Sequence, residues 1–195
     1  MNKNCLLCGV GGQGVVLASK LIAYAAMEKG MEVRTSETIG MAQRGGSVVS
    51  HVRLGQKIYS PMIPKGSADL IIAFEPAEAV RNLAYLKEDG AVIVNQKAVQ
   101  PVTAILTENN YKAEEMITYL KQHIKRLYVV DGEEICHKSG SAKVLNVALL
   151  GAAIRSETLD ISMEEMKIQI EKNVKSKFIE MNLKALELAD TGFVK

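Results

Sequence analysis

The sequence predicts an α/β fold whose C-terminal part is helical, and three observations predict it. Short apolar runs, typical of buried strands, alternate with longer segments of helical periodicity, which is the pattern of a sheet covered by helices. A glycine-rich turn joins the first strand to the first helix. From about residue 142 onward, every periodic segment is helical. The chain has 195 residues, which suits one compact domain, so we expect a single domain spanning residues 1–195.

The first part of the chain should contain a long helix between strands. In chain order, the pattern predicts strand 4–9, helix 13–29, strand 31–36 and strand 47–54. Gly30 directly follows the helix, where glycine suits the C-terminal cap. Gly55-Gln56 places glycine first, as a type II′ hairpin turn requires. We therefore expect residues 57–60 to form a partner strand for strand 47–54.

The second part of the chain continues the alternation and then becomes helical. Apolar runs predict strands at residues 69–74, 91–95 and 126–131. Helical periodicity predicts helices at residues 76–86, 112–125, 142–155, 162–173 and 175–189. Pro76 suits the first turn of its helix, and Ser162 with Glu165 matches a capping box.

Composition excludes several classes of function. Lys and Arg number 24 and Asp and Glu number 22, a net charge of +2, which is too balanced for a nucleic-acid-binding face. Aromatic residues make up 5% of the chain, too few for stacking on bases. The chain has no apolar run long enough to span a membrane, and its first residues do not form a signal peptide. We therefore expect a cytoplasmic protein that binds neither nucleic acid nor membrane.

The three cysteines do not predict a metal or redox site. Cys5 and Cys8 form a C-x-x-C within a predicted strand, where positions three apart point to opposite faces of the sheet. We expect both to be small buried hydrophobic residues. Three thiolates also cannot build a four-thiolate iron–sulfur cluster by themselves. We therefore expect no metal ligands in this chain.

The histidines give no clear catalytic pattern. His51 lies on a strand beside the second glycine-rich segment, where it could face a site, but a position on the strand surface is the favoured interpretation. His137 adjoins Cys136 directly, and adjacent side chains diverge on regular structure, so we do not expect a nucleophilic Cys–His pair.

The strongest local signal is the G-x-G-x-x-G motif of Gly9, Gly11 and Gly14, with Gly12 as an additional glycine. The motif follows a strand and opens a helix, where backbone N–H groups and the helix dipole favour an anion. We therefore expect a Rossmann-like three-layer sandwich in which Gly11, Gly12, Gln13 and Gly14 form a turn that faces an anionic cofactor or a partner. A turn that serves only helix–sheet packing remains an alternative.

A dinucleotide site would also require an acidic residue about 20 positions later, at the end of the second strand. Glu32 has the spacing but begins that strand, and Glu37 lies at the end of the strand but comes late. Neither residue fits well. A stand-alone nucleotide-binding oxidoreductase therefore remains an alternative but is not the favoured interpretation.

A second glycine-hinged segment lies between the second and third strands. In this segment, Gln43 and Arg44 are followed directly by Gly45 and Gly46. An arginine held between glycines can pair bidentately with a carboxylate or a phosphate. We therefore expect Gln43, Arg44, Gly45 and Gly46 to face a substrate, cofactor or partner, at the same edge of the sheet as the first turn. A surface turn with a solvated arginine remains the alternative.

Together these segments resemble the gamma domain of the pyruvate/2-oxoacid ferredoxin oxidoreductases. The resemblance begins with G-x-G-G-Q-G-V, R-G-G, V-R and S-P motifs, at residues 9–15, 44–46, 52–53 and 60–61. Later similarities lie at residues 69–72, 90–95, 143–146, 150–151 and 182–185, so the resemblance covers nearly the whole chain. Within the family, residues 40–46 are most similar to the beta subunits of indolepyruvate ferredoxin oxidoreductases. The gamma subunits of pyruvate or 2-oxoglutarate enzymes remain an alternative.

The resemblance implies a small subunit that is not catalytic alone. The complex would oxidatively decarboxylate an aryl 2-oxoacid such as indolepyruvate to an acyl-CoA, with coenzyme A as cosubstrate, and pass two electrons to ferredoxin. Thiamine diphosphate, Mg²⁺ and [4Fe-4S] clusters would reside on a larger alpha subunit, and this chain alone would bind no cofactor. A pure assembly subunit, with no residue near the chemistry, remains an alternative.

Overall fold

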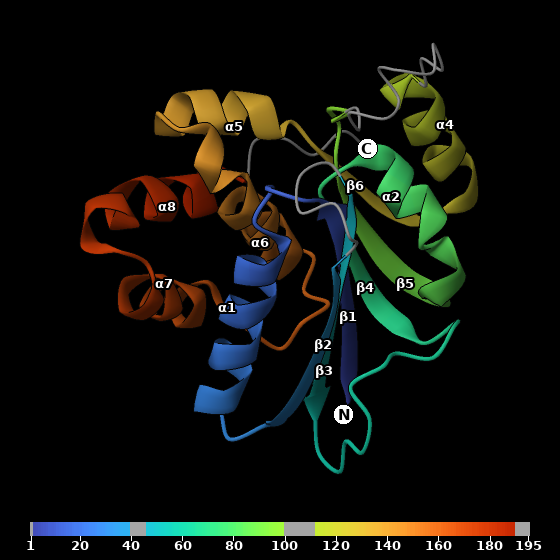
Figure 1. Cartoon of the computed structure of the whole chain (residues 1–195), viewed down its shortest axis with the longest axis horizontal. Coiled ribbons are helices and arrows are strands. Elements are labelled where there is room, and N and C mark those ends of the chain that lie inside the picture. Colours follow the sequence, from blue (N-terminus) through green and yellow to red (C-terminus); the bar gives the residue numbers. More distant parts are fainter. Residues whose placement is uncertain (1, 40–45, 100–111, 190–195) are drawn as a thin grey trace.

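The computed structural model describes residues 2–39, 46–99 and 112–189. In this part of the chain, six strands form one sheet, which lies between two layers of helices (Figure 1). The strands are β1 (Lys3–Val10), β2 (Glu32–Ile39), β3 (Ser47–Gly55), β4 (Ala68–Ala73), β5 (Leu86–Asn95) and β6 (Arg126–Val130). Their order across the sheet is β2-β3-β1-β4-β5-β6.

The described helices cover both faces of this sheet. They are α1 (Val15–Glu28), α2 (Pro76–Arg81), α4 (Ala113–His123), α5 (Gly132–Ser139), α6 (Leu145–Arg155), α7 (Met163–Asn173) and α8 (Ser176–Leu188). Helices α1 and α6 pack on one face and α2 and α4 on the other, while α5, α7 and α8 form an outer group next to α1 and α6. None of the described helices combines the length and the apolarity needed to cross a membrane. The predicted Rossmann-like three-layer sandwich with a helical C-terminal part is confirmed.

The directions of the strands determine which strand ends lie at the same edge of the sheet. Strand β4 pairs in parallel with β1 and β5, and β5 pairs in parallel with β6. Strand β3 lies antiparallel between β2 and β1. The C-terminal ends of β1, β2, β4, β5 and β6 therefore meet at one edge of the sheet, together with the start of β3. We call this edge the carboxyl edge.

The predicted hairpin after β3 is wrong. Residues 57–60 form no strand, and the chain from 56 to 65 runs as an irregular loop. The reason is that β3 already pairs with β2 along one side and with β1 along the other. No free side of β3 remains for a hairpin partner.

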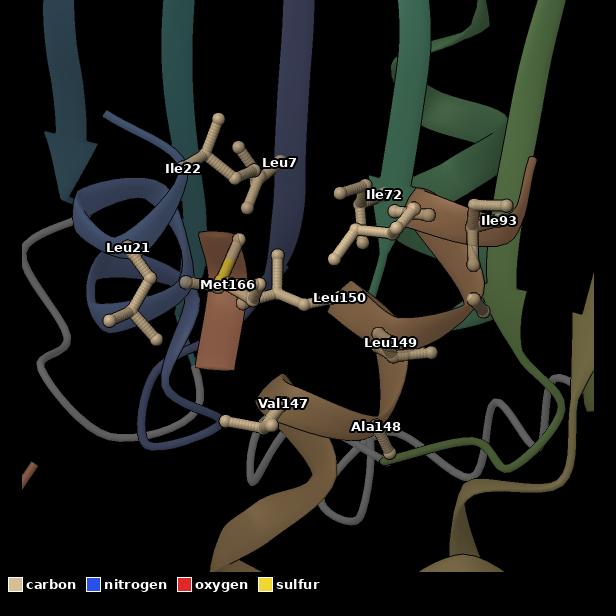
Figure 2. Packing of buried hydrophobic residues seen from close by; sticks show 14 of the residues in the cluster. Leu7, Leu21, Ile22, Ile72, Ile93, Val147, Ala148, Leu149, Leu150 and Met166 are labelled. Atoms are coloured by element: carbon tan, nitrogen blue, oxygen red, sulfur yellow. The ribbon is translucent and has the colours of Figure 1, made fainter. Parts of the chain in front are cut away.

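The core is aliphatic and divided by the sheet into two clusters. In the larger cluster, side chains of β1, β4 and β5 pack against α1, α6 and α7 (Figure 2). The residues labelled there are Leu7, Leu21, Ile22, Ile72, Ile93, Val147, Ala148, Leu149, Leu150 and Met166. The smaller cluster lies on the opposite face, beneath α2 and α4. Because both faces of the central strands are covered, the buried parts of these strands are continuous runs of apolar and small residues, as is usual for buried parallel strands; these runs are 5–10 in β1, 70–73 in β4 and 91–94 in β5.

The two cysteines of the C-x-x-C lie as predicted, one on each face of β1. Cys5 belongs to the larger apolar cluster and Cys8 to the smaller one, and both are fully buried. Burial raises the pKa of both thiols well above the usual value. The prediction of two small buried hydrophobic residues is therefore confirmed.

Candidate functional site

The glycine-rich turn lies at the carboxyl edge, between the end of β1 and the start of α1 (Figure 1). Helix α1 leaves β1 on one face of the sheet, whereas α2 leaves the adjacent β4 on the other face. The turn therefore lies at the point where the strand order reverses, which is where open α/β sheets bind their ligands.

The conformation of this turn requires glycine at position 14. Gly14 adopts a left-handed backbone, with φ of 83°, and occupies the N-cap position of α1. A Cβ atom on Gly14 would lie 2.8 Å from Nδ2 of Asn146, at the start of α6. The glycine thus allows the first turn of α1 to approach α6 closely, so part of the motif serves packing.

The side chain of Gln13 closes the gap between β1 and β4. Its Oε1 accepts a hydrogen bond from the backbone N–H of Val10 at 2.7 Å, and its Nε2 donates to the carbonyl of Phe74 at 3.1 Å. The same carbonyl accepts a hydrogen bond from Nδ2 of Asn95 at 3.3 Å. The carboxamide of Gln13 therefore positions the turn, and a ligand there would meet the glycine backbone.

The last residue of the second glycine-rich segment, Gly46, lies next to the first turn. The backbone N–H of Gly11 donates to the carbonyl of Gly46 at 2.9 Å. The structure thus brings together Gly11 and Gly46, one from each predicted turn. Gln43, Arg44 and Gly45 lie outside the described residues.

The chain that leaves the second segment is also tied to α2. The hydroxyl of Ser47 donates a hydrogen bond to Oε2 of Glu78 at 2.6 Å. Glu78 is buried and also pairs with Arg81. Because Gly46 is bonded to the first turn and Ser47 to α2, the end of the second segment is fixed on both sides.

Beside these contacts lies a concave site of about 440 Å³, between the glycine turn, the start of α1 and the start of β3. Its described lining consists of Val10, Gly11, Gly12, Gly14, Val15, Val16 and Val48. None of these side chains carries a charge. The first N–H groups of a helix have no acceptor within the helix and favour an anion, whereas the valines favour an apolar group. The arrangement therefore suits a ligand or loop with an anionic end and an apolar body.

A buried carboxylate that was not predicted from the sequence lies at the same edge. Glu75 is 2% exposed and lies two residues after the end of β4, and its Oε2 caps α2 by accepting the backbone N–H of Glu78 at 3.0 Å. Its Oε1 is buried without a hydrogen-bond partner among the described residues. Burial raises the pKa of the Glu75 carboxyl. The signal was present in the sequence, since a polar residue between an apolar strand and Pro76 is typical of a helix cap.

Neither acidic residue considered for a dinucleotide site lies on a strand next to β1, because β3 separates β2 from β1. Oε2 of Glu32 accepts the backbone N–H of Ile58 at 3.2 Å, at the edge opposite the glycine turn. Glu37 lies exposed on β2. Glu32 is thus engaged in holding a loop, which removes it as a ribose ligand.

His51 differs from its predicted position. It is 2% exposed rather than on the strand surface, and its Nδ1 accepts the backbone N–H of Ile63 at 3.2 Å. Its ring also meets the ring of Tyr85 edge to face. The irregular loop that follows β3 covers this side chain.

Among the described residues, no group of three or more His, Cys, Asp or Glu side chains is arranged to hold a metal ion. The three thiols are buried, and burial raises the pKa of each. The described lining of the site at the glycine turn offers backbone amides and apolar walls.

Comparison with known proteins identifies the family. The family model described as pyruvate ferredoxin/flavodoxin oxidoreductase matches residues 4–190. The chain belongs to this family. Among its relatives, the indolepyruvate oxidoreductase subunit IorB of Archaeoglobus fulgidus is 40% identical over 189 residues, covering 96% of this chain and 94% of the relative. The resemblance found in the sequence is thus confirmed.

Other similar proteins are more distant. The common gamma subunit of the pyruvate/ketoisovalerate oxidoreductases of Pyrococcus abyssi is 31% identical over 186 residues, covering 91% of this chain and 89% of the relative. The crystal structure of a keto/oxoacid ferredoxin oxidoreductase gamma subunit from Geobacter sulfurreducens has the same fold, with a TM-score of 0.73 and 21% identity over 97% of this chain and 94% of that one. The chain is therefore a small subunit of the oxoacid:ferredoxin oxidoreductase family.

Proposed function

We propose that this chain is the small subunit of a thiamine diphosphate-dependent 2-oxoacid:ferredoxin oxidoreductase that acts on an aryl pyruvate, with indolepyruvate as the expected substrate. The complex would decarboxylate the 2-oxoacid oxidatively, join the acyl group to coenzyme A and pass two electrons to ferredoxin. The observation that carries the proposal is the 40% identity to IorB along almost the whole chain, against 31% to the gamma subunit. The whole chain would act as one gamma-type domain in the cytoplasm.

The larger alpha subunit would hold thiamine diphosphate, Mg²⁺ and the [4Fe-4S] clusters. Bound there, these groups would supply the electron sink for decarboxylation and the route for electrons to ferredoxin. The small chain would complete one wall of the active site and would not be catalytic alone.

The contribution of this chain would come from the carboxyl edge. The amides of Gly12, of Gly14 and of the first turn of α1 would meet an anionic group, since a helix N-terminus favours negative charge. Arg44 would pair with a carboxylate or phosphate from its position between glycines. The hydrogen bond from Gly11 to the carbonyl of Gly46 supports this proposal, because it holds the end of the Arg44 segment beside the first turn.

The test is a substrate comparison with the reconstituted complex. The small chain and the larger alpha subunit would be co-expressed, and ferredoxin reduction measured with coenzyme A and indolepyruvate, pyruvate or 2-oxoglutarate. We expect the highest kcat/KM with indolepyruvate and no turnover without the small chain. A preference for pyruvate or 2-oxoglutarate would contradict the proposal and would support a gamma subunit of a pyruvate or 2-oxoglutarate enzyme instead. Tight binding of NAD(H) or FAD to the isolated chain in calorimetry would instead support a stand-alone nucleotide-binding oxidoreductase.

A further inference from the structure

The loop that joins β3 to β4 exposes two large apolar side chains at the edge opposite the glycine turn. We call residues 56–65 the Tyr59 loop; it projects at the bottom of Figure 1. Tyr59 is 90% exposed and Met62 is 45% exposed. Ile58 and Ile63, which flank them, are buried. The loop is therefore anchored at two points and presents its apolar tip to solvent between them.

An arginine of the sheet holds this tip in place. Nη1 of Arg53 donates to the carbonyls of Ser60 at 3.0 Å and Met62 at 3.3 Å. Nε of the same guanidinium donates to Oδ1 of Asn4 on β1 at 3.0 Å. The V-R and S-P motifs of the sequence are thus joined into one structural unit, in which Arg53 fixes the backbone on both sides of Pro61.

Two further hydrogen bonds hold the anchors of the loop. The backbone N–H of Ile58 donates to Oε2 of Glu32, and that of Ile63 donates to Nδ1 of the buried His51, both at 3.2 Å. The acceptors lie on β2 and β3, so the sheet itself fixes the loop. A loop without regular structure is thereby ordered before any partner binds, which lowers the entropic cost of binding.

The charged side chains of the loop itself and of the adjoining Arg53 are all basic, and Glu32 of β2, which accepts the backbone N–H of Ile58, is an acidic neighbour. Between residues 53 and 66 the chain carries Arg53, Lys57 and Lys65 and has no Asp or Glu. Lys57 and Lys65 are exposed. A partner that covers Tyr59 should therefore carry acidic residues around an apolar pocket.

We propose that the Tyr59 loop is a docking site for the larger subunit of the complex, which would receive Tyr59 and Met62 in an apolar pocket with an acidic rim. Tyrosine and methionine are enriched at the centres of protein interfaces, and preorganised aromatic anchors contribute most of the binding energy there. A second copy of this chain fits less well, because a two-fold contact through the loop would bring like charges together. The identity of the occupant rests on the proposed function.

The test measures the affinity of the full-length chain for the purified larger subunit. Tyr59→Ala should weaken binding by about 30-fold, as expected for an interface anchor. Tyr59→Phe keeps the ring and should stay within about threefold of the unchanged chain. Tyr119→Ala removes another exposed tyrosine, on α4, and should leave the affinity unchanged. Arg53→Gln keeps Tyr59 but loosens the loop and should also weaken binding.

The outcomes separate this inference from the proposed function. If the unchanged chain binds the larger subunit and Tyr59→Ala binds equally well, the docking site is overturned and the proposed function stands. If the unchanged chain does not bind the larger subunit, both are overturned. If a photo-reactive group at position 59 crosslinks to a second copy of this chain within the complex, the inference that the larger subunit covers Tyr59 is overturned. Tyr59 is almost fully exposed, so its replacement should not prevent folding, which thermal unfolding of the variant would check.

Discussion

At Gly14, a left-handed backbone conformation and a close contact with Asn146 both disfavour a side chain. Gly14→Ala should lower the free energy of unfolding by about 2–3 kcal/mol, because a left-handed backbone costs an alanine about 1–2 kcal/mol and the added Cβ would displace the amide of Asn146. Urea unfolding measures this loss. Gly12→Ala is the matched control, since Gly12 also has a positive φ, of 101°, but no atom within 4 Å of the added Cβ. Equal losses for both variants would show that the contact with Asn146 does not matter.

His51 makes the stability of the fold depend on pH. Burial lowers the pKa of the folded imidazole, whose Nδ1 accepts the N–H of Ile63. Above the unfolded pKa of about 6.5 both states are neutral and the full stability is present. As the pH falls below this value, the unfolded chain binds the proton more readily, so stability is lost until the pH passes the folded pKa.

The comparison is urea unfolding at pH 7.5 and pH 5.5. His51→Asn retains an acceptor for Ile63 and should show a smaller loss of stability between the two pH values than the unchanged chain. His123→Asn, at an exposed position, should behave like the unchanged chain. Identical pH dependence in all three would contradict the role of His51.

At the scale of elements, local sequence signals predicted helices better than they predicted which strands pair with each other. The capping box of α7 is present, with the backbone N–H of Ser162 bonded to Glu165 at 2.7 Å and the N–H of Glu165 bonded to the Ser162 hydroxyl at 3.2 Å. Helix α5 was missed, although Asp131 caps its start and Gly140, with φ of 80°, ends it. Both of these signals could be seen in the sequence. The antiparallel pairing of β3 could not be seen there, because strand pairing depends on residues that are distant in the chain.

The capping box gives a prediction for α7. Ser162→Ala should lower the free energy of unfolding by about 1 kcal/mol, since it leaves the backbone N–H of Glu165 without its acceptor. Ser176→Ala, at the first residue of α8, removes a hydroxyl that caps no helix and should change little. Thermal or urea unfolding of both variants checks the difference. A loss in Ser162→Ala no larger than in the control would show that the cap contributes nothing to stability.

At the scale of the whole molecule, the sequence predicted the position of the glycine turn but not its surroundings. The motif placed Gly11 to Gly14 after β1 because strand, turn and helix are adjacent in the chain. The contacts that surround the turn come from Phe74, Glu78 and Asn146, far along the chain, and only the folded topology brings them there. The same limit applies to the Tyr59 loop, whose bracing residues lie on three different strands, β1, β2 and β3.

The glycine turn and the Tyr59 loop lie at opposite edges of the sheet, because β3 begins at the first and ends at the second. The molecule could therefore be held by its partner at one edge while the other edge faces the active site. This separation implies that changes at the two edges should have different effects. Substitutions in the Tyr59 loop should weaken assembly of the complex. Substitutions at the carboxyl edge should lower turnover in a complex that still assembles.

Replacement of Arg44 tests whether the second glycine-rich segment serves turnover. Arg44→Ala would be assayed in the purified complex for ferredoxin reduction with coenzyme A and indolepyruvate, beside Arg34→Ala, which removes an exposed arginine of β2. We predict that both complexes assemble and that kcat/KM falls about 10- to 100-fold for Arg44→Ala only, since a charge-assisted pair with an anionic group is lost. An intact Arg44→Ala complex with unchanged turnover and substrate affinity would show that Arg44 does not contribute to the active site.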